Sequence, residues 1–320
     1  MLVPSLLAAI SAVAFQTPAP PAPVTPTPAP VYMESKAGLV DWNCDANGGM
    51  DRFRSDRAFP KFIGPISNPV LAKDPRSLTE IRGLFIGNSI PAEHPLGDGD
   101  FQVYAAQIRV ALSERLTFIA DKDGYANINP GGGGPSQNGW LNLAAGLKYT
   151  FIRDVENQFL VAGGFMYEAQ TGSADVFQSH GDGLVTLFAT LGKEVCCDGH
   201  FLANIGYQLP VDSSANSSMF YTSLHLDYRL FDFLYPLVEL NWYRWTAGGD
   251  RGLPPALGEG DGLLNLGTSG VAGNNLVTVA LGMKAMLSEC MEVGFAWEKP
   301  VSDRKDLIDN RLLVELILRY

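Results

Sequence analysis

The sequence has few charged residues and lacks long apolar runs. Asp, Glu, Lys and Arg together make up 18% of its 320 residues, whereas a typical soluble domain has roughly 25%. Beyond the N-terminus no apolar stretch reaches the roughly 20 residues that a membrane-spanning helix needs. Of these two absences, the second excludes a bundle of membrane helices. They leave a soluble β protein or a membrane β-barrel, whose polar lumen dilutes its hydrophobicity.

Positive charge is also scarce. The formal net charge of −11 argues against nucleic acid as a partner, because binding to phosphates requires clustered Lys and Arg. By contrast, glycine (34 residues), proline (21 residues) and aromatic residues (10%) are plentiful. This composition favours an all-β chain with many turns.

The first 76 residues divide into three segments. Residues 1–15 form an apolar stretch of signal-peptide length with a small-residue cleavage site at Ala12-Val13-Ala14, although no Lys or Arg precedes it. Residues 16–33 are a Pro-rich linker, which favours an extended spacer. Residues 34–76 are expected to be a periplasmic segment that precedes the barrel and could enter it as a plug.

From Ser77 onward, apolar and polar residues alternate in segments of strand length. Period two is typical of strands, since successive side chains point to opposite faces. Segments of this length suit tilted strands that cross a bilayer. The predicted strands are 80–88, 101–112, 115–122, 140–151, 157–168, 183–193, 199–209, 219–229, 233–246, 275–287, 290–299 and 310–320.

The connections between these segments alternate in length. Those after the even-numbered strands are short, as at Ser113-Glu114 and Ser288-Glu289, whereas the others are long and turn-rich, as at 123–139 and 247–274. Short periplasmic turns and long extracellular loops are typical of outer-membrane barrels. The sequence therefore predicts a transmembrane antiparallel β-barrel of about 12 strands over residues 77–320, in the outer membrane of a diderm bacterium.

The chain ends in an alternating strand, "RLLVELILRY". Its apolar residues fall on one side, and Arg311, Glu315 and Arg319 fall on the other. This segment resembles the assembly signal of bacterial outer-membrane barrels, which typically ends in an aromatic residue. The resemblance implies recognition by the barrel-assembly machinery, with outer-membrane lipid against the apolar side.

Four further stretches, "SLTEIRGLFI", "DVENQFLVAGGF", "LYPLVELNWY" and "VAGNNLVTVALGMKA", are similar to an uncharacterised family of predicted outer-membrane proteins. That family resembles transporters of the phenol-degradation MetA-pathway type. The similarity covers roughly residues 60–320. It implies a barrel architecture and carries no catalytic or binding residues over to this chain.

The predicted inward faces carry charges of both signs. Twelve strands fall between the eight that side chains fill and the sixteen that enclose an aqueous channel. The lumen could therefore be a narrow polar pore, or ion pairs could close it. The candidate pore-lining residues are Arg82, Arg109, Lys148, Glu168, His225, Asp227, Arg229, Glu239, Asn241, Lys284, Glu298, Arg311 and Glu315.

The predicted outer loops carry most of the net negative charge. A field of one sign at a pore mouth attracts cations and repels anions. Three loops contain Gly-Asp-Gly, which we interpret as solvated turns because the spacing matches no calcium-binding loop. The acidic loop residues are Glu93, Asp98, Asp100, Asp123, Asp175, Asp182, Asp212, Asp250, Glu259, Asp261, Asp303, Asp306 and Asp309.

The pattern offers little for catalysis. Twelve-stranded outer-membrane phospholipases place a His and a Ser on the lipid-facing wall, whereas here His94 and His180 fall in loops, His200 near a turn and His225 on the inward face. No catalytic triad can be assembled from this arrangement. We expect no enzymatic activity, no cofactor and no bound metal.

The four cysteines, Cys44, Cys196, Cys197 and Cys290, all fall on the predicted periplasmic side. An even number of cysteines in an oxidising compartment permits disulfides. The adjacent Cys196 and Cys197 are not expected to pair with each other. Either could instead pair with Cys290 or Cys44.

Two functions remain open from the sequence. One is a porin-like channel for passive transport of small solutes, with a preference for cations. The other is a non-conducting barrel that anchors the envelope or binds a partner through its acidic loops.

Overall fold

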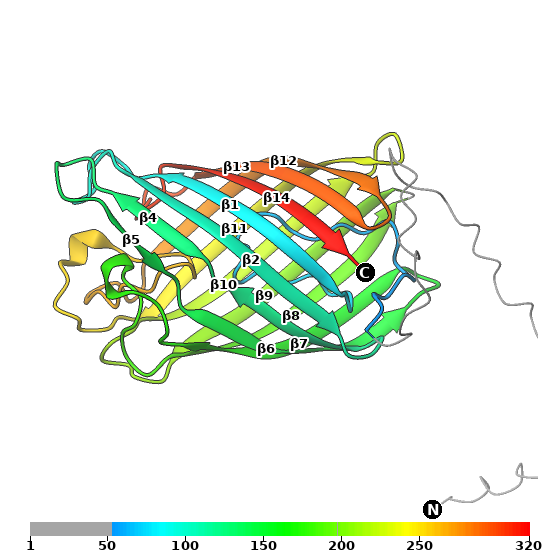
Figure 1. Ribbon diagram of the computed structural model, residues 1–320, viewed down its shortest axis with the longest axis horizontal. Coiled ribbons are helices and arrows are strands. Elements are labelled where there is room, and N and C mark those ends of the chain that lie inside the picture. Colours follow the sequence, from blue (N-terminus) through cyan, green and yellow to red (C-terminus); the bar gives the residue numbers. More distant parts are fainter. Residues whose placement is uncertain (1–52, 197) are drawn as a thin grey trace, which may run out of the picture. The chain divides into compact units, whose positions relative to one another are not determined.

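The alternating pattern folds into one antiparallel sheet in the computed structural model, which describes residues 53–196 and 198–320 (Figure 1). The predicted signal peptide (1–15), the Pro-rich linker (16–33), Cys44 and Cys197 lie outside the described residues. The strands within the described range are β1 Glu80–Ser89, β2 Asp100–Ala111, β3 Leu116–Lys122, β4 Tyr125–Asn129, β5 Gln137–Trp140, β6 Leu143–Asp154, β7 Phe159–Ala169, β8 Leu184–Cys196, β9 Gly199–Pro210, β10 Ser218–Tyr228, β11 Leu234–Ala247, β12 Asn275–Ser288, β13 Met291–Pro300 and β14 Asn310–Arg319.

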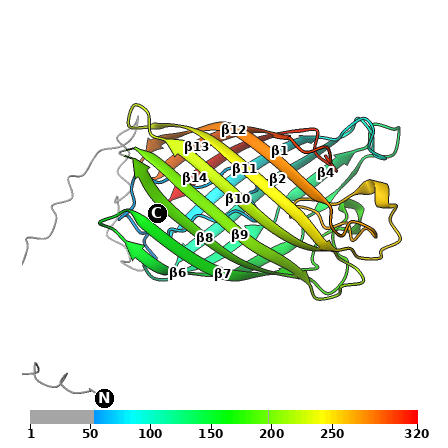
Figure 2. The same ribbon diagram turned by 180° about the vertical axis from the view of Figure 1, so that it is seen from behind.

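The sheet closes on itself because the first strand pairs with the last. β1 and β14 are antiparallel partners from Glu80↔Arg319 to Ser89↔Asn310. Each following strand pairs with its neighbour around the wall, and Figure 2 shows β7 to β11 side by side on the opposite face. Closure satisfies the backbone hydrogen bonds of both edges, which a sheet in lipid requires.

Twelve strands form the wall, as predicted. The structure has fourteen strands in its described residues, but two of the twelve positions in the wall are each occupied by two short strands in line. β2 pairs with β3 through Ile108–Ala111 and with β4 through Asp100–Tyr104. In the same way β5 pairs with β4, and β6 pairs with β3. β3 with β4 therefore forms one strand of the wall, and β5 with β6 forms the next.

The secondary structure predicted for one loop was wrong. Residues 123–139 were expected to be a long loop, but β4 and β5 form a hairpin there whose turn spans 130–136. β2 begins at Asp100, and its first five residues supply a pairing edge for β4. The many Gly and Asn residues of this stretch concealed the short alternation of "YANIN", whose Ala126 and Ile128 are buried.

Connections alternate in length as predicted. The short-turn end carries the β2–β3, β6–β7, β8–β9, β10–β11 and β12–β13 turns, whereas the long-loop end carries the others, including 170–183 and 248–274. Two one-turn 3₁₀ helices, η1 Ala174–Val176 and η2 Pro255–Leu257, lie in these two long loops. None of the helices in 53–196 and 198–320 is long and apolar enough to cross a bilayer.

The outer surface of the wall is apolar, as the alternation predicted. In β14, Leu312, Val314 and Leu316 are more than 40% exposed, whereas the intervening Arg311 and Glu315 are 2% exposed. Charged side chains thus face the interior and aliphatic side chains face outward. This is the arrangement that a barrel requires when lipid surrounds it.

Gly124 holds the junction between β3 and β4. Its φ of +115° is rarely adopted by other residues, and a Cβ there would lie 2.5 Å from the Tyr104 carbonyl oxygen. We expect Gly124→Ala to destabilise the barrel by about 1–3 kcal/mol, the usual cost of a strained backbone position. Heat-dependent gel migration should show this as a lower unfolding temperature. Gly132→Ala is the control, because nothing lies within 4 Å of its Cβ position, and an equal loss in both variants would contradict the assignment.

Candidate channel interior

A segment that precedes the barrel lies inside it. Residues 59–76, here called the plug segment, contain Phe59, Phe62 and Ile63 with fully buried side chains. Both flanks of the plug segment are held at the short-turn end, where the Ser55 amide donates to the Tyr320 carbonyl (3.0 Å) and the Tyr320 amide donates to the Thr79 carbonyl (2.9 Å). The chain therefore enters the lumen from the short-turn end and returns there to begin β1.

Wall side chains hydrogen-bond to the backbone of the plug segment. The Ile66 and Ser67 amides donate to the Glu239 carboxylate at 2.9 and 2.6 Å, and the Lys73 amide donates to Asn204 Oδ1 at 2.7 Å. Arg82 donates to the carbonyls of Pro65 and Ile66. Buried backbone groups need partners, and here side chains of the wall supply them in place of a neighbouring strand.

More of these contacts lie further along the plug segment. Lys148 donates to the Asp74 carbonyl and to the Arg76 carbonyl (2.6 Å), and Thr190 donates to the Lys73 carbonyl (2.8 Å). The plug segment is therefore held by polar groups from several sides of the barrel.

A continuous chain of ion pairs crosses the interior and includes one residue of the plug segment. It alternates in sign through six wall strands and the plug segment, so every charge has an opposite neighbour. In order its members are Lys73, Asp121, Arg109, Glu80, Arg319, Glu292, Lys284, Glu315 and Arg82. Lys73 Nζ lies 2.9 Å from Asp121 Oδ2, and Arg109 Nη1 lies 2.6 Å from Glu80 Oε1.

A second polar group joins two histidines to the plug segment. His200 Nδ1 lies 2.7 Å from Asp227 Oδ1, and His225 Nε2 lies 2.9 Å from Asp227 Oδ2. His225 Nδ1 is in turn 2.6 Å from Glu239 Oε1, the carboxylate that accepts the plug amides. All four side chains are buried, so this group links the wall of β9, β10 and β11 to the tip of the plug segment.

The loop between β11 and β12 enters from the opposite end. Its Asp261 pairs with Arg311 of β14, which also lies 3.4 Å from Glu298. Glu259 accepts hydrogen bonds from Ser217, Leu266 and Thr268. Burial raises the pKa of the Glu259 carboxyl above its usual value.

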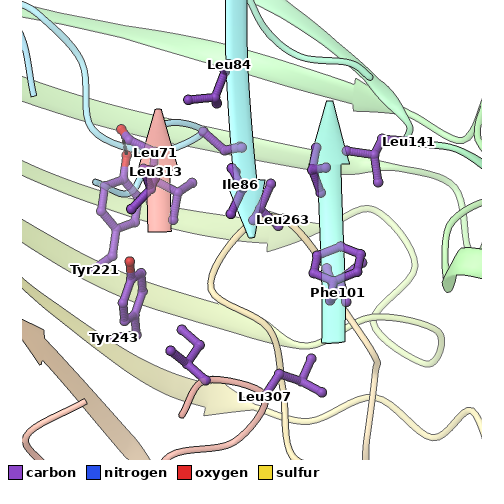
Figure 3. Close-up of a cluster of buried hydrophobic side chains, with 14 of the residues drawn as sticks. Leu71, Leu84, Ile86, Phe101, Leu141, Tyr221, Tyr243, Leu263, Leu307 and Leu313 are labelled. Carbon is purple, nitrogen blue, oxygen red and sulfur yellow. Dashed lines mark hydrogen bonds between the residues drawn. The ribbon is translucent and has the colours of Figure 1, made fainter. Parts of the chain in front are cut away.

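The plug segment and this loop meet within the barrel. A Cβ on Gly262 would lie 2.8 Å from the Leu71 side chain, and Figure 3 shows Leu71 and Leu263 in one apolar cluster with Leu84 and Ile86. The interior is therefore filled from both ends in this conformation.

The structure buries most of the predicted lumen residues on the inner face. Arg229 differs: β10 ends at Tyr228, so Arg229 lies in the following turn and pairs with Asp198 (2.9 Å) and Asp232 (3.5 Å). The buried ones are Arg82, Arg109, Lys148, Glu168, His225, Asp227, Glu239, Asn241, Lys284, Glu298, Arg311 and Glu315.

Sequence reasoning missed the charges that the plug segment itself contributes. Lys73, Asp74 and Arg76 are buried, and Asp74 pairs with Arg76 at 2.6 Å. The only available signal was their position between apolar residues in "PVLAKDPRSL". Because that stretch lacks the two-residue period of a strand, it does not indicate which way these side chains point or which residues they contact.

The cysteine predictions have a mixed outcome. Cys290 is disulfide-bonded. Among the described residues Cys196 is a free, exposed cysteine, so its proposed pairing was wrong. Cys196 ends β8 with its side chain exposed at the turn.

Not all acidic loop residues face solvent. Glu259, Asp261 and Asp306 carry side chains that are largely buried, because the long loops fold inward. Glu93, Asp98, Asp175, Asp182, Asp250 and Asp303 remain exposed. The interpretation of Gly260-Asp261-Gly262 as a solvated turn was therefore wrong, since Asp261 pairs with Arg311 inside.

Comparison with known proteins identifies the fold and no family. No family model matches the chain, and no curated protein matches it. An outer membrane channel from Pseudomonas putida F1 has a TM-score of 0.57 at 11% identity, covering 81% of this chain and 100% of that chain. The NanC porin (TM-score 0.47, 9% identity, 76% and 100% covered) and the KdgM porin (TM-score 0.44, 10% identity, 75% and 99% covered) are more distant.

The first of these comparisons, together with the closed sheet and its apolar exterior, makes the chain a transmembrane β-barrel of the outer-membrane type. The recognition of this fold from the C-terminal strand and the loop pattern is confirmed. The predicted outer-membrane localisation agrees with this fold.

Glu315 is the carboxylate between two cations of the ion-pair chain, Arg82 and Lys284. Removing its charge leaves two buried cations facing each other, and breaking such a buried pair costs about 3–5 kcal/mol. We expect Glu315→Gln to lower the midpoint of urea unfolding, followed by gel migration. Glu289→Gln, in an exposed turn, is the matched control, and equal midpoints for the two variants would show that the ion-pair chain contributes little.

Proposed function

We propose that this barrel is an outer-membrane channel for passive passage of small solutes, closed in the present conformation by the plug segment and the β11–β12 loop. The observation that carries the proposal is the polarity of the contacts between plug and wall. Ion pairs and side-chain hydrogen bonds form many of these contacts, including those of Glu239 with the Ile66 and Ser67 amides, beside the apolar contacts of Ile63 and Leu71. Water can replace such contacts when the segment moves, whereas a purely apolar filling would resist hydration.

Buried ion pairs contribute little net stability, because desolvation offsets their attraction. The closed wall also does not depend on the plug segment, since β1 to β14 pair only with one another. Movement of the segment would therefore leave an intact cylinder lined by hydrated charges. The buried residues named above, including His225, Asp227 and Lys284, would then line the pore.

The alternative is a non-conducting barrel that anchors the envelope or binds a partner. The filling of the lumen from both ends, with Leu71 against Gly262, favours it. We also propose that the barrel-assembly machinery recognises β14, whose alternation of exposed aliphatic and buried charged residues supports this role.

Conductance in planar bilayers tests the two functions. We expect rare discrete openings from the wild type and frequent openings from Glu239→Ala. That substitution removes two hydrogen bonds to a charged acceptor, each about 1.5–3 kcal/mol, and about 1.4 kcal/mol changes an equilibrium tenfold. Open probability should rise at least tenfold. Glu289→Ala should behave as wild type, and quiet bilayers containing folded wild type and folded Glu239→Ala would support the anchoring function instead.

The exposed acidic loop residues predict selectivity. In asymmetric KCl, reversal potentials should indicate a preference for K⁺ over Cl⁻. The preference should weaken at high salt, because dissolved ions shorten the range of the electric field of the acidic loop residues. Replacing Asp175, Asp182 and Asp250 with Asn should bring the permeability ratio closer to one. A preference for Cl⁻ in the wild type would contradict the loop-charge argument.

A further inference from the structure

The plug segment has no helix or strand of its own to pair its backbone groups. Among the described residues, the first element of secondary structure is β1, which begins at Glu80. Short turns pair a few groups, such as the Leu71 and Ala72 amides with the Asn68 carbonyl. Buried amides and carbonyls need hydrogen-bond partners, so the wall of the barrel has to supply the others.

Wall side chains supply these partners along the whole stretch 65–76. Gln107 of β2 donates to the Pro69 carbonyl at 3.0 Å, and Thr150 of β6 donates to the Pro75 carbonyl at 3.1 Å. They add to the contacts of Glu239 and the other wall residues with plug amides and carbonyls described above. The inner wall therefore binds a peptide main chain from several strands at once.

Most hydrogen bonds from the wall go to the main chain of this stretch, and fewer go to its side chains. The side-chain contacts are those of Asn68 with Ser223 Oγ (2.9 Å), Ser67 Oγ with Asn241 (2.9 Å) and Lys73 with Asp121 (2.9 Å). Main-chain groups are the same in every peptide, and recognition through them provides affinity with little dependence on sequence. A peptide of another sequence would therefore offer most of the same partners to the wall.

The plug segment also places apolar side chains against apolar parts of the wall. Ile63, Ile66 and Leu71 belong to one buried cluster with Leu84 of β1. Figure 3 shows Leu71 close to Tyr221, whose hydroxyl donates to the Leu71 carbonyl at 3.3 Å. The wall thus has polar groups for a main chain and apolar surface for side chains within the same lumen.

This combination distinguishes between classes of solute. A sugar could bond to polar groups such as Glu239 and Asn204, but it has no side chains for the apolar surface around Leu84. A hydrocarbon could cover that surface, but it would leave the polar groups buried without partners, which is unfavourable. A peptide supplies both amides and carbonyls for the first and apolar side chains for the second.

We propose that the inner wall of the barrel is a binding site for short peptides, and that the plug segment occupies this site as an internal peptide. When the plug segment moves, Glu239, Asn204 and Arg82 lose their main-chain partners. These side chains then become available to an incoming peptide. Short peptides are thereby the solutes of the proposed channel, so this site rests on the proposed function.

Binding of a synthetic peptide to the full chain in detergent tests the proposal. The probe has the sequence of residues 66–73, ISNPVLAK, with a fluorescent label at its N-terminus, and fluorescence anisotropy reports its binding. Ser67→Pro removes the amide that donates to Glu239 Oε2, so it weakens the seating of the plug segment and leaves the wall unchanged. We expect Ser67→Pro to bind the probe at least tenfold more tightly than wild type, because the wild-type plug segment competes with the probe.

Two controls separate main-chain recognition from non-specific binding. A probe that is N-methylated at the positions of Ile66, Ser67 and Lys73 keeps its side chains but lacks the three amide donors, and it should bind at least tenfold more weakly. In the Ser67→Pro background, Glu239→Ala should weaken binding of the unmodified probe at least tenfold. Glu289→Ala, in an exposed turn, should change it less than twofold.

Three results would overturn the proposal. One is equal binding of the methylated and unmodified probes. Another is displacement of the probe by an equal concentration of raffinose or naphthalene, which would assign the site to sugars or hydrocarbons. The third is no binding to a folded variant of the plug segment. Gel migration before and after heating verifies folding, and Leu71→Ala, which removes an apolar contact of the plug segment, replaces Ser67→Pro if the latter does not fold.

Planar-bilayer conductance of Ser67→Pro separates the peptide site from the proposed function. If both are right, the unmodified probe should interrupt the KCl current, and the methylated probe should interrupt it at least tenfold less often. A protein that binds the probe but never conducts would support the peptide site and contradict the channel. A conducting protein whose current the probe leaves unchanged would support the channel and overturn the peptide site.

Discussion

The pairing of β1 with β14 is the constraint on which the rest of the structure depends. An apolar exterior demands lipid, and lipid supplies no hydrogen bonds to a free strand edge, so the sheet must close. Ten paired residues, Glu80 to Ser89 against Arg319 to Asn310, achieve this. Closure then forces every second side chain into a confined interior, where each charge needs a partner. The ion-pair chain and the contacts to the plug segment follow from that requirement.

Period-two alternation made the wall predictable, because one face meets lipid and the other does not. In β14 the exposed Leu312 and the buried Arg311 could be assigned from spacing alone. The same rule assigned Lys284 and Glu298 to the interior. It could not say which charge pairs with which, since Glu315 meets Lys284 and Arg82 through strands that are far apart in sequence.

Segments without a period were not predictable in detail. The path of the plug segment is set by wall side chains, such as Glu239 and Asn204, that lie more than a hundred residues away. The β4–β5 hairpin was concealed by Gly and Asn, and its existence depends on the edge that β2 offers. Arg229 shows the opposite error, because a strand that ends one residue early moves a charge from the lumen to a turn. In each case the missing information is a tertiary partner.

The charged and the apolar surfaces of the interior place different demands on a solute. Near the short-turn end, alternating charges such as Glu80, Arg319 and Glu292 would favour hydrated molecules once the plug segment moves. Toward the long-loop end, apolar side chains such as Leu84, Phe101 and Leu141 share the interior with the buried ion pair of Arg311 and Asp261. A single path through both parts would require an apolar solute to displace ion pairs, or a polar solute to cross an apolar zone. Passage of a polar solute along the axis would therefore require both the plug segment and the β11–β12 loop to move, since they fill the interior from opposite ends.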